Sequence, residues 1–419
     1  MTRRRLAAAL AFAVLACLLG PQAHLWAEEA APKAILDMDT VKHEAPKLGK
    51  DKTPGGTIEL VDGKFGKACK FAFVEGAQSG FFTAWINATP DWDKAAGFSF
   101  WVKGDGSASW GGLELIDGEN YGFRYGYCFP IDSTEWKKIT VSWSDIIPEL
   151  PPADFVNAKA GYAPSKFRNF WFGKWFYWRD YPAHSFTIDQ VALEPEIAVE
   201  AKDYTPAAGG VPKLLEKLKA KQPVTIVTMG DSLSDKRHWA NREVLWSEVL
   251  VADLKKTFGG DVKLVNPAIG GTLLQQNLIL MPRWLKDTPA PDVVTVCFGF
   301  NDWDGGMRGE KYKAMLRLAV DRIRRMTGGK SEIVLMTTCP AMERWDTMEE
   351  LAEAARVVAK EKKTGLADIA AAFHKKADTD AAAREPLYCN DKTHLGKDGH
   401  TLAAKTVQEA IQAGAADAK

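Results

Sequence analysis

The chain has 419 residues and a formal net charge of zero, with 54 basic and 54 acidic residues. Its length predicts about two domains, and a hydrophobic fraction of 46% supplies enough apolar residues for packed cores and excludes global disorder. Because positive charge is not in excess, we expect no general attraction to nucleic acid or to an anionic membrane.

The N-terminus has the pattern of a secretory signal. Three arginines at 3–5 precede an apolar run over 6–19, and a short stretch ending at Ala27 follows. The apolar run is shorter than the roughly 20 residues that span a bilayer. We therefore expect a signal peptide over 1–27, with an uncleaved anchor as the alternative. No second apolar span follows, which predicts a secreted or periplasmic protein without a stable membrane span.

Five cysteines remain after removal of the signal: Cys69, Cys128, Cys297, Cys339 and Cys389. An exported protein can form disulfides, but an odd number leaves at least one thiol unpaired. Cys69 could pair with Cys128, or Cys339 with Cys389, whereas Cys297 lies in an apolar run and is expected to be a buried free thiol. The cysteines lack the spacing of a zinc site, so no catalytic metal is expected.

Residues 34–200 alternate apolar and polar side chains and are rich in aromatic and β-branched types, the pattern of half-buried strands. The clearest strands are expected at 97–103, 113–116, 136–141, 170–172 and 186–193. Glycine- and proline-containing turn signals separate them. Several short strands at this spacing predict an antiparallel β sandwich.

After an expected linker at 201–215, residues 216–415 alternate strands with helices. Apolar runs typical of buried strands lie at 224–227, 262–265, 291–298 and 333–336, and helical patterns lie at 241–258, 311–326, 348–363 and 397–411. This order predicts a parallel sheet with helices on both faces. Ligands of such folds bind beyond the carboxyl ends of the strands.

A serine and a histidine lie where this fold places its ligands. Ser232 directly follows the first strand of the second half, where we expect a helix N-terminus whose amides favour a developing oxyanion, although the same residues could simply cap a helix. Asp391 and His394 share a loop before the last helix. A serine needs a base to take its proton, and the base needs an acid to orient it. His238 is the rival base.

Two glycine-containing loops follow the next two strands. Gly271 comes after the second strand, and Asn301 comes after the third, within Gly299–Asp302. Acyl transfer needs donors aimed at the oxyanion, and a backbone amide with an asparagine side chain would serve. Singly, each glycine could be a turn residue, and Asn301 with Asp302 a helix cap. The histidines at 374 and 400 fall in helical patterns and are expected to be solvated.

In this order the four loops resemble the SGNH (GDSL-type) hydrolase family over residues 220–412. The resemblance implies a three-layer, flavodoxin-like α/β domain. It also implies Ser232 as nucleophile, Asp391 and His394 as its partners, and an oxyanion hole formed by Ser232, Gly271 and Asn301. The implied reaction is ester hydrolysis through an acyl-enzyme, without a metal or organic cofactor. Phe300 and Leu395 stand where the family often has other residues.

The first half resembles the galactose-binding-like jelly rolls that occur as carbohydrate-binding modules, on the strands at 97–106 and 186–191. Nine of the 15 tryptophans lie there, and flat rings can stack on sugars or fill a core. We expect the core role for Trp101, Trp136 and Trp143. The candidates for substrate contact are Trp303 in the second half and Trp171, Trp175 and Trp178 in the first. A structural calcium is conceivable, with Asp37, Asp39 and Asp189 as ligands.

A jelly roll followed by an SGNH domain is the layout of some esterases that deacetylate plant polysaccharides. The resemblance therefore implies a secreted serine esterase that removes O-acetyl groups from a carbohydrate, with an acetylated glycan or other ester as its substrate. Two alternatives stay open. One is an esterase or acyltransferase of lipid or small esters, and the other is a glycan-binding protein with an inactive hydrolase domain.

Overall fold

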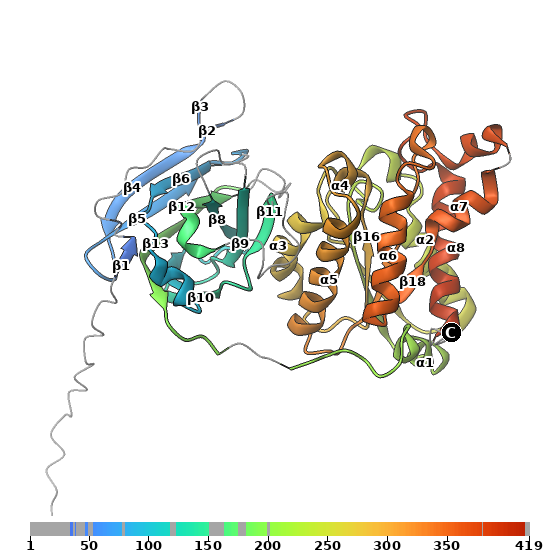
Figure 1. Ribbon diagram of the computed structural model, residues 1–419, viewed down its shortest axis with the longest axis horizontal. Helices are drawn as coiled ribbons and strands as arrows, with labels where there is room; N and C mark the ends of the chain where they lie inside the picture. Colours follow the sequence, from blue (N-terminus) through green and yellow to red (C-terminus); the bar gives the residue numbers. More distant parts are fainter. Residues whose placement is uncertain are drawn as a thin grey trace, which may run out of the picture. The chain divides into compact units, whose positions relative to one another are not determined.

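The computed structural model describes residues 34–36, 38, 47–48, 53–77, 80–117, 123–150, 163–174, 182–198, 202–378 and 380–414. The expected signal segment at 1–27 lies outside these residues. None of the helices in the described ranges is long and apolar enough to cross a membrane. Among the described residues, the regular elements from Ala34 to Glu194 are mainly β strands, and strands alternate with helices from Pro212 onward (Figure 1).

In the described residues of the first half, β strands are accompanied by two short 3₁₀ helices. They are β1 Ala34–Leu36, β2 Lys47–Leu48, β3 Thr53–Pro54, β4 Gly56–Asp62, β5 Lys67–Phe73, β6 Gly80–Trp85, η1 Pro90–Lys94, β7 Gly97–Gly104, β8 Trp110–Asp117, β9 Phe123–Pro130, β10 Lys137–Ser142, β11 Ile147–Leu150, η2 Pro164–Lys166, β12 Phe167–Lys174 and β13 His184–Glu194. One sheet has the order β10-β7-β13-β5-β4, with β1 also paired to β13, and the other has β11-β9-β8-β12-β6. Their pairs are antiparallel, as the sequence predicts.

Phenylalanine rings from both sheets form the core of the sandwich. Phe100 of β7 is fully buried, and its ring centroid lies 5.1 Å from that of Phe129 in β9 and 5.5 Å from that of Phe172 in β12, both edge to face. Phe186 of β13 meets Phe129 in the same way at 5.5 Å. Edge-to-face pairs are favourable beyond the area they bury, so these rings fix how the two sheets pack.

The second half alternates strands and helices. Its elements are α1 Pro212–Lys219, β14 Val224–Gly230, η4 Trp239–Asn241, α2 Trp246–Phe258, β15 Val262–Val265, α3 Leu274–Leu285, β16 Val293–Cys297, α4 Phe300–Asp304, α5 Gly309–Met326, β17 Glu332–Met336, η5 Met342–Arg344, α6 Glu349–Lys362, β18 Gly365–Ala367, α7 Ile369–Ala377, η6 Ala381–Leu387 and α8 Lys397–Ala413. The strands form one parallel sheet in the order β15-β14-β16-β17-β18. This is the flavodoxin-like order, whose switch point lies between β14 and β16.

Each face of the parallel sheet contributes to its own core. In β14, Val227 and Met229 belong to a core with side chains of α3, α5 and α6, whereas Val224 and Ile226 belong to a core with side chains of α1, α2, α7 and α8. Successive side chains of a strand point to opposite faces. The mainly apolar strand at 224–227, interrupted only by Thr225, therefore reflects burial on both faces, and the predicted three-layer α/β fold is confirmed.

Helices α3 and α1 are among the elements that the sequence did not predict, and each has a physical reason. Helix α3 is buried on nearly all sides and contains Pro282, so it shows no polar face from which a helical period can be read. Helix α1 begins at Pro212, inside the range expected as a linker. Its Leu214 and Leu218 are buried, and the amide of Val211 just before it donates to the carbonyl of Gly414.

The core role expected for Trp101, Trp136 and Trp143 is wrong as stated, because all three are only half-buried. Trp143 packs at the margin of the core beside the buried Trp92, with ring centroids 6.3 Å apart. On Trp101, the ammonium of Lys64 lies 4.1 Å from the ring centroid. Phenylalanine supplies most of the buried aromatic surface instead.

All five cysteines of the described residues are free thiols, and four of them are buried. Neither of the two conceivable disulfides is formed. The free, buried state expected for Cys297 is confirmed, and burial, together with the charge of Asp231, raises the pKa of its thiol to about 12. Such a thiol is unreactive near neutral pH.

Truncating one ring should test the sandwich core. We expect Phe100→Ala to lower the free energy of unfolding by about 3–5 kcal/mol, because it removes a fully buried ring and leaves a cavity between the sheets. Urea unfolding of the full chain measures the loss. Phe123→Ala removes a ring that is 41% exposed in β9 and should cost less than about 1 kcal/mol; equal losses would contradict this account of the core.

Candidate active site

Ser232 lies in the turn that follows β14. The expectation that it begins a helix is wrong, because the chain turns from 231 to 238 and α2 begins only at Trp246. Two carboxylates hold this turn by accepting backbone amides. Asp231 Oδ1 accepts from the amide of Leu233, and Asp235 Oδ1 accepts from that of Arg237. Aspartate side chains that bind nearby amides stabilise turns over helices. Activation of Ser232 therefore depends on neighbouring groups rather than on a helix dipole.

The structure brings Ser232, His394 and Asp391 together in one line. Nε2 of His394 lies 2.9 Å from Oγ of Ser232, and Nδ1 of the same ring lies 2.5 Å from Oδ2 of Asp391. The histidine side chain is 17% exposed, so solvent and substrate can reach it. Nucleophile, base and orienting acid within hydrogen-bonding distance are the arrangement that serine catalysis requires.

The acid and the base share a small closed loop. Tyr388 and Leu395 form a β-bridge, and the amide of Cys389 donates to the carbonyl of His394 over 2.7 Å. Asp391 Oδ1 accepts the amides of Thr393 and His394 while Oδ2 faces the imidazole. Partial burial acts to raise the pKa of Asp391, but the bonds from the ring and the two amides outweigh it and lower the pKa. The Asp391 carboxylate beside the His394 ring is thus held ionised.

The loops with Gly271 and Asn301 are joined to each other beside the serine turn. Asn301 at the start of α4 donates from Nδ2 to the carbonyl of Thr272, and the amide of Ile269 donates to the carbonyl of Gly230 at the end of β14. Gly271 has a φ of +78°, and a Cβ there would have no atom within 4 Å. Glycine is therefore required at 271 by a backbone conformation that L residues rarely adopt, and the space beside Gly271 is open.

Gly299, just before α4, is constrained in two ways. Its φ is +145°, and a Cβ would lie 2.3 Å from the Thr338 hydroxyl. Glycine here lets the chain leave β16 and enter α4 against the end of β17. This close approach of Gly299 to Thr338 fixes where α4 begins and hence where Asn301 lies, which explains the glycine of the Gly-Phe-Asn-Asp pattern.

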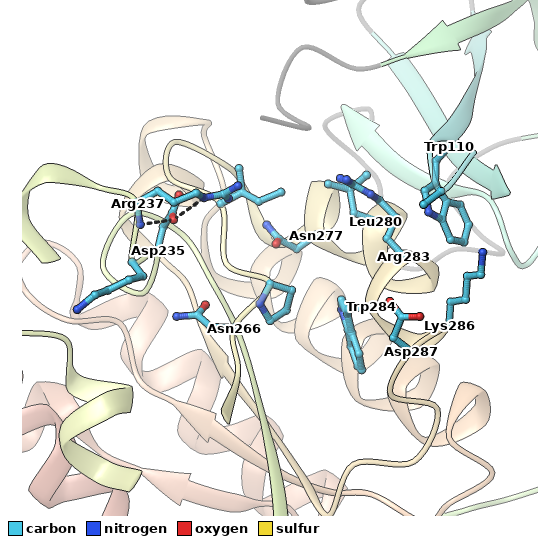
Figure 2. A pocket seen from close by; sticks show the side chains of 14 residues that line it. Trp110, Asp235, Arg237, Asn266, Asn277, Leu280, Arg283, Trp284, Lys286 and Asp287 are labelled. Carbon is cyan, nitrogen blue, oxygen red and sulfur yellow. Dashed lines mark hydrogen bonds and ion pairs between the residues drawn. The ribbon is translucent and has the colours of Figure 1, made fainter. Parts of the chain in front are cut away.

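Asp235 ties the Gly271 loop to the serine turn. Its Oδ2 accepts the amide of Gly270 at 2.9 Å, and its Oδ1 pairs with Nε of Arg237 at 3.0 Å. Arg237 in turn donates to the carbonyl of Ala268. Figure 2 shows the Asp235–Arg237 pair at one end of a pocket that is also lined by Asn266 and Asn277. Burial acts to raise the pKa of Asp235, but Arg237 and the two amides lower it. Sequence reasoning missed this network.

Two buried carboxyls lie behind the site. Asp231 and Asp302 are each less than 2% exposed, and Asp302 Oδ1 accepts the amide of Leu274 at the start of α3. Burial raises the pKa of Asp231 to about 7, with a contribution from the charge of Asp302, and burial raises the pKa of Asp302 to about 6. Each anchors a backbone amide beside a proposed catalytic loop.

His238, the rival base, lies against His394 rather than taking its place. The two imidazole rings stack with centroids 4.2 Å apart, and the ring of Trp239 meets His394 edge to face at 5.8 Å. His238 and Trp239 follow Ser232 closely in the chain. Sequence reasoning missed Trp239, for which this proximity to Ser232 was the available signal.

The tryptophans proposed for substrate contact have different surroundings. Trp303 in α4 is half-buried, and the guanidinium carbon of Arg308 lies 3.4 Å from its ring centroid. Trp171 is half-buried in β12, between the buried Phe170 and Phe172. The other two, Trp175 and Trp178, lie outside the described residues.

The calcium hypothesis gains no support from Asp189. This residue is 1% exposed, and its Oδ2 accepts the amides of Lys64 and Phe65 at 2.7 and 2.8 Å. Asp37 and Asp39 lie outside the described residues. In the ranges that are described, His, Cys, Asp and Glu form no group of three or more that could hold a metal.

A serine hydrogen-bonded to a histidine, at the carboxyl edge of a parallel α/β sheet, is the arrangement that serine hydrolases use. Residues 228–402 match the model of the GDSL-like lipase/acylhydrolase family, and residues 36–151 match that of carbohydrate binding domain family 11. Residues 228–402 therefore carry a GDSL-like hydrolase domain, and residues 36–151 carry a carbohydrate-binding-type jelly roll, so both resemblances are confirmed. The first match supports an SGNH-type ester hydrolase.

Among curated proteins, none matches the chain. Solved structures similar to its parts include a family 11 carbohydrate-binding module from Clostridium thermocellum in complex with a β-1,3-1,4-mixed-linked tetrasaccharide (19% identity, 40% of this chain and 97% of that one, TM-score 0.30). A mutant acetyl-xylooligosaccharide esterase from Geobacillus Stearmophilus has 22% identity over 45% of this chain and 94% of its own, with a TM-score of 0.36. A two-domain esterase active on acetylated mannans has 18% identity over 51% of this chain and 58% of its own, with a TM-score of 0.41.

Asp235 should matter for turnover although it does not touch the serine hydroxyl. We expect Asp235→Ala to lower kcat on a small ester about 10- to 100-fold, because releasing Gly270 misplaces the neighbouring Gly271 amide. Steady-state kinetics measure the loss. The neighbouring Lys236→Ala, which removes an exposed ion pair with Glu248, should stay within about twofold. A similar kcat for both variants would contradict this role.

His400 predicts a pH-dependent term in stability. The residue is 1% exposed, contrary to the expected solvation, and burial lowers its pKa to about 4. The unfolded chain, with a pKa near 6.5, binds the proton more readily, so this stabilisation is present above pH 6.5 and is lost as the pH falls towards 4. From pH 7 to pH 5 the stability advantage of wild type over His400→Gln should shrink by about 2 kcal/mol in urea unfolding. A constant difference would contradict it.

Proposed function

We propose that the protein is a secreted carbohydrate O-acetylesterase that acts through Ser232. The observation that carries this proposal is the aligned contact of Asp391, His394 and Ser232, with distances of 2.5 and 2.9 Å along the line. The family 11 carbohydrate-binding match over 36–151 supports a glycan as the substrate. The signal-like residues 1–27 support export.

In the proposed reaction, His394 Nε2 takes the proton of Ser232 as Oγ attacks the ester carbonyl carbon. Asp391, held ionised, stabilises the imidazolium and keeps Nδ1–H directed towards itself. The π electrons of the carbonyl move to its oxygen, which gives a tetrahedral intermediate with a negatively charged oxygen. When the tetrahedral intermediate collapses, the C–O bond to the sugar breaks, and His394 gives its proton to the departing sugar oxygen.

The oxyanion is stabilised by three donors in this proposal. They are the amides of Ser232 and Gly271 and the side-chain amide of Asn301. One Nδ2 proton of Asn301 goes to the Thr272 carbonyl, and the other is assigned to the oxyanion. Donors fixed before the reaction need no reorganisation, which is why such sites lower the barrier.

The second half of the cycle releases the acid. Water takes the place of the sugar, gives a proton to His394 Nε2 and attacks the acyl carbon. The tetrahedral intermediate collapses, the Ser232 ester bond breaks, and Oγ recovers its proton from His394. This scheme uses only side chains, backbone amides and water, so the proposal requires no metal or organic cofactor.

The decisive experiment is a substrate panel assayed with wild type and Ser232→Ala. We expect wild type to release acetate from acetylated polysaccharides and Ser232→Ala to lose the activity by at least about 10⁴-fold. Ser133→Ala, at a turn before β10, is the matched serine control and should retain wild-type turnover. Full activity of Ser232→Ala would overturn the mechanism. Hydrolysis of lipid esters without any acetate release from glycans would overturn the substrate assignment.

Asn301→Ala should separate oxyanion stabilisation from nucleophilic attack. Loss of one oxyanion donor costs about 100- to 1,000-fold in kcat, so the variant should be impaired less than Ser232→Ala, with KM little changed. The same kinetic assay measures both variants. A kcat within about threefold of wild type would show that Asn301 does not bind the oxyanion.

A further inference from the structure

Trp239 stands out among the large apolar side chains of the α/β half. Its side chain is 52% exposed, whereas Trp246, Trp284 and Trp345 of the same half are at most 9% exposed. Within residues 202–378 and 380–414 it is the large hydrophobic residue left open to solvent. Exposed indole surface is unfavourable in water, so a ligand that covers this ring would gain from its burial.

The position of Trp239 is fixed relative to the nucleophile. Asn241, at the end of the same short helix η4, is fully buried, and its Nδ2 donates to the carbonyl of Ser232 at 2.6 Å and to that of Asp235 at 2.7 Å. The backbone amide of Asn241 donates to the carbonyl of His238. One buried amide therefore joins η4 to the backbone of the serine itself, and a ligand bound on Trp239 would be held at a defined distance from Ser232.

The side of the site on which Trp239 lies determines what it can bind. Its ring meets the ring of His394 edge to face, with centroids 5.8 Å apart. In ester hydrolysis the general acid must contact the oxygen of the departing alcohol. The alcohol part of the substrate therefore lies beside His394, and Trp239 borders that part rather than the acyl group.

The surroundings of Trp239 suit a sugar better than a lipid. Arg242 and Glu243, which follow η4, are exposed and polar, and the single exposed ring is far smaller than the contiguous apolar patch that marks a lipid surface. A pyranose ring presents C–H groups on its face and hydroxyls at its edge. An aromatic face with polar neighbours matches that chemistry.

We propose that Trp239 is a sugar-binding platform, on which a pyranose ring of the alcohol part of the substrate stacks during deacetylation. This inference rests on the proposed carbohydrate esterase function and adds to it a residue that selects the substrate. Binding energy from such a contact places the ester oxygen near His394 and so lowers KM for glycans.

The test compares a glycan ester with an ester whose alcohol has no ring. Trp239→Ala should lower kcat/KM on an acetylated xylo- or manno-oligosaccharide at least about 10-fold, mainly through KM, and change kcat/KM on ethyl acetate less than about twofold. Trp239→Phe should recover most of the loss, because it keeps an aromatic face. Phe123→Ala, which removes another exposed ring, should affect neither substrate.

A second measurement does not depend on turnover. In Ser232→Ala labelled with 5-fluorotryptophan, the ¹⁹F resonance assigned through Trp239→Phe should shift on addition of acetylated oligosaccharide and should not shift with ethyl acetate. Absence of a shift at oligosaccharide concentrations above the wild-type KM would overturn the platform.

Other kinetic outcomes also overturn it. Equal losses on both esters would show that Trp239 orients His394 instead of binding sugar. A loss that grows from ethyl acetate to ethyl hexanoate would place the acyl chain on the ring. If wild type hydrolyses ethyl acetate but no acetylated glycan, the proposed function fails. If it hydrolyses both and Trp239→Ala matches wild type, only the platform fails.

Discussion

The parallel pairing of β14 with β16 is the constraint on which the site depends. The two strands run side by side from Ile226 opposite Val293 to Gly230 opposite Cys297, and their carboxyl ends meet at one edge of the sheet. Ser232 follows the first strand and Asn301 follows the second, so the fold brings the proposed nucleophile and a proposed oxyanion donor to the same edge. This pair is also the switch point of the sheet, where α/β folds open a crevice. Two carboxylates connect the Gly271 loop and the start of α3 to this pair of strands, because Asp235 accepts the amide of Gly270 and Asp302 accepts that of Leu274.

Much of the architecture could be read from the sequence because it depends on local patterns. The alternation in the first half predicted the sandwich, and the strand at 224–227 with its following Ser232 predicted both the sheet and the nucleophile loop. Asp391 and His394 could be paired because three residues within one loop suffice to bring them together. Helix α3 could not be found in the same way, since burial on nearly all sides removes the amphipathic period. His400 was expected in solvent because helical spacing alone does not tell which face of α8 a distant element covers, and the amide of Trp246 at the start of α2 donates to its Nδ1.

Contacts set by tertiary structure account for the residues that sequence reasoning missed. Nothing local to Asp235 indicates that its carboxylate accepts an amide 35 residues further along the chain. The stacking of His238 on His394 joins two distant segments. His238, the alternative base in the sequence analysis, therefore lies beside the proposed base His394. The role proposed for Trp239 likewise depends on a tertiary contact, because its exposed indole lies against the imidazole of His394. The tryptophan count favoured the first half as the place of substrate contact, whereas the exposed ring that contacts His394 belongs to the second half.

The long separation between Ser232 and His394 has a consequence for the order of biosynthesis. The hydrogen bond between them spans 162 positions of the chain, whereas the bonds that build the Asp391–His394 loop join residues at most seven positions apart. During synthesis, Ser232 is therefore made long before His394, the base of the proposed mechanism, whereas His394 and Asp391 are made almost together. In that mechanism the serine is activated only once the segment around 391–394 has been made and His394 lies against Ser232.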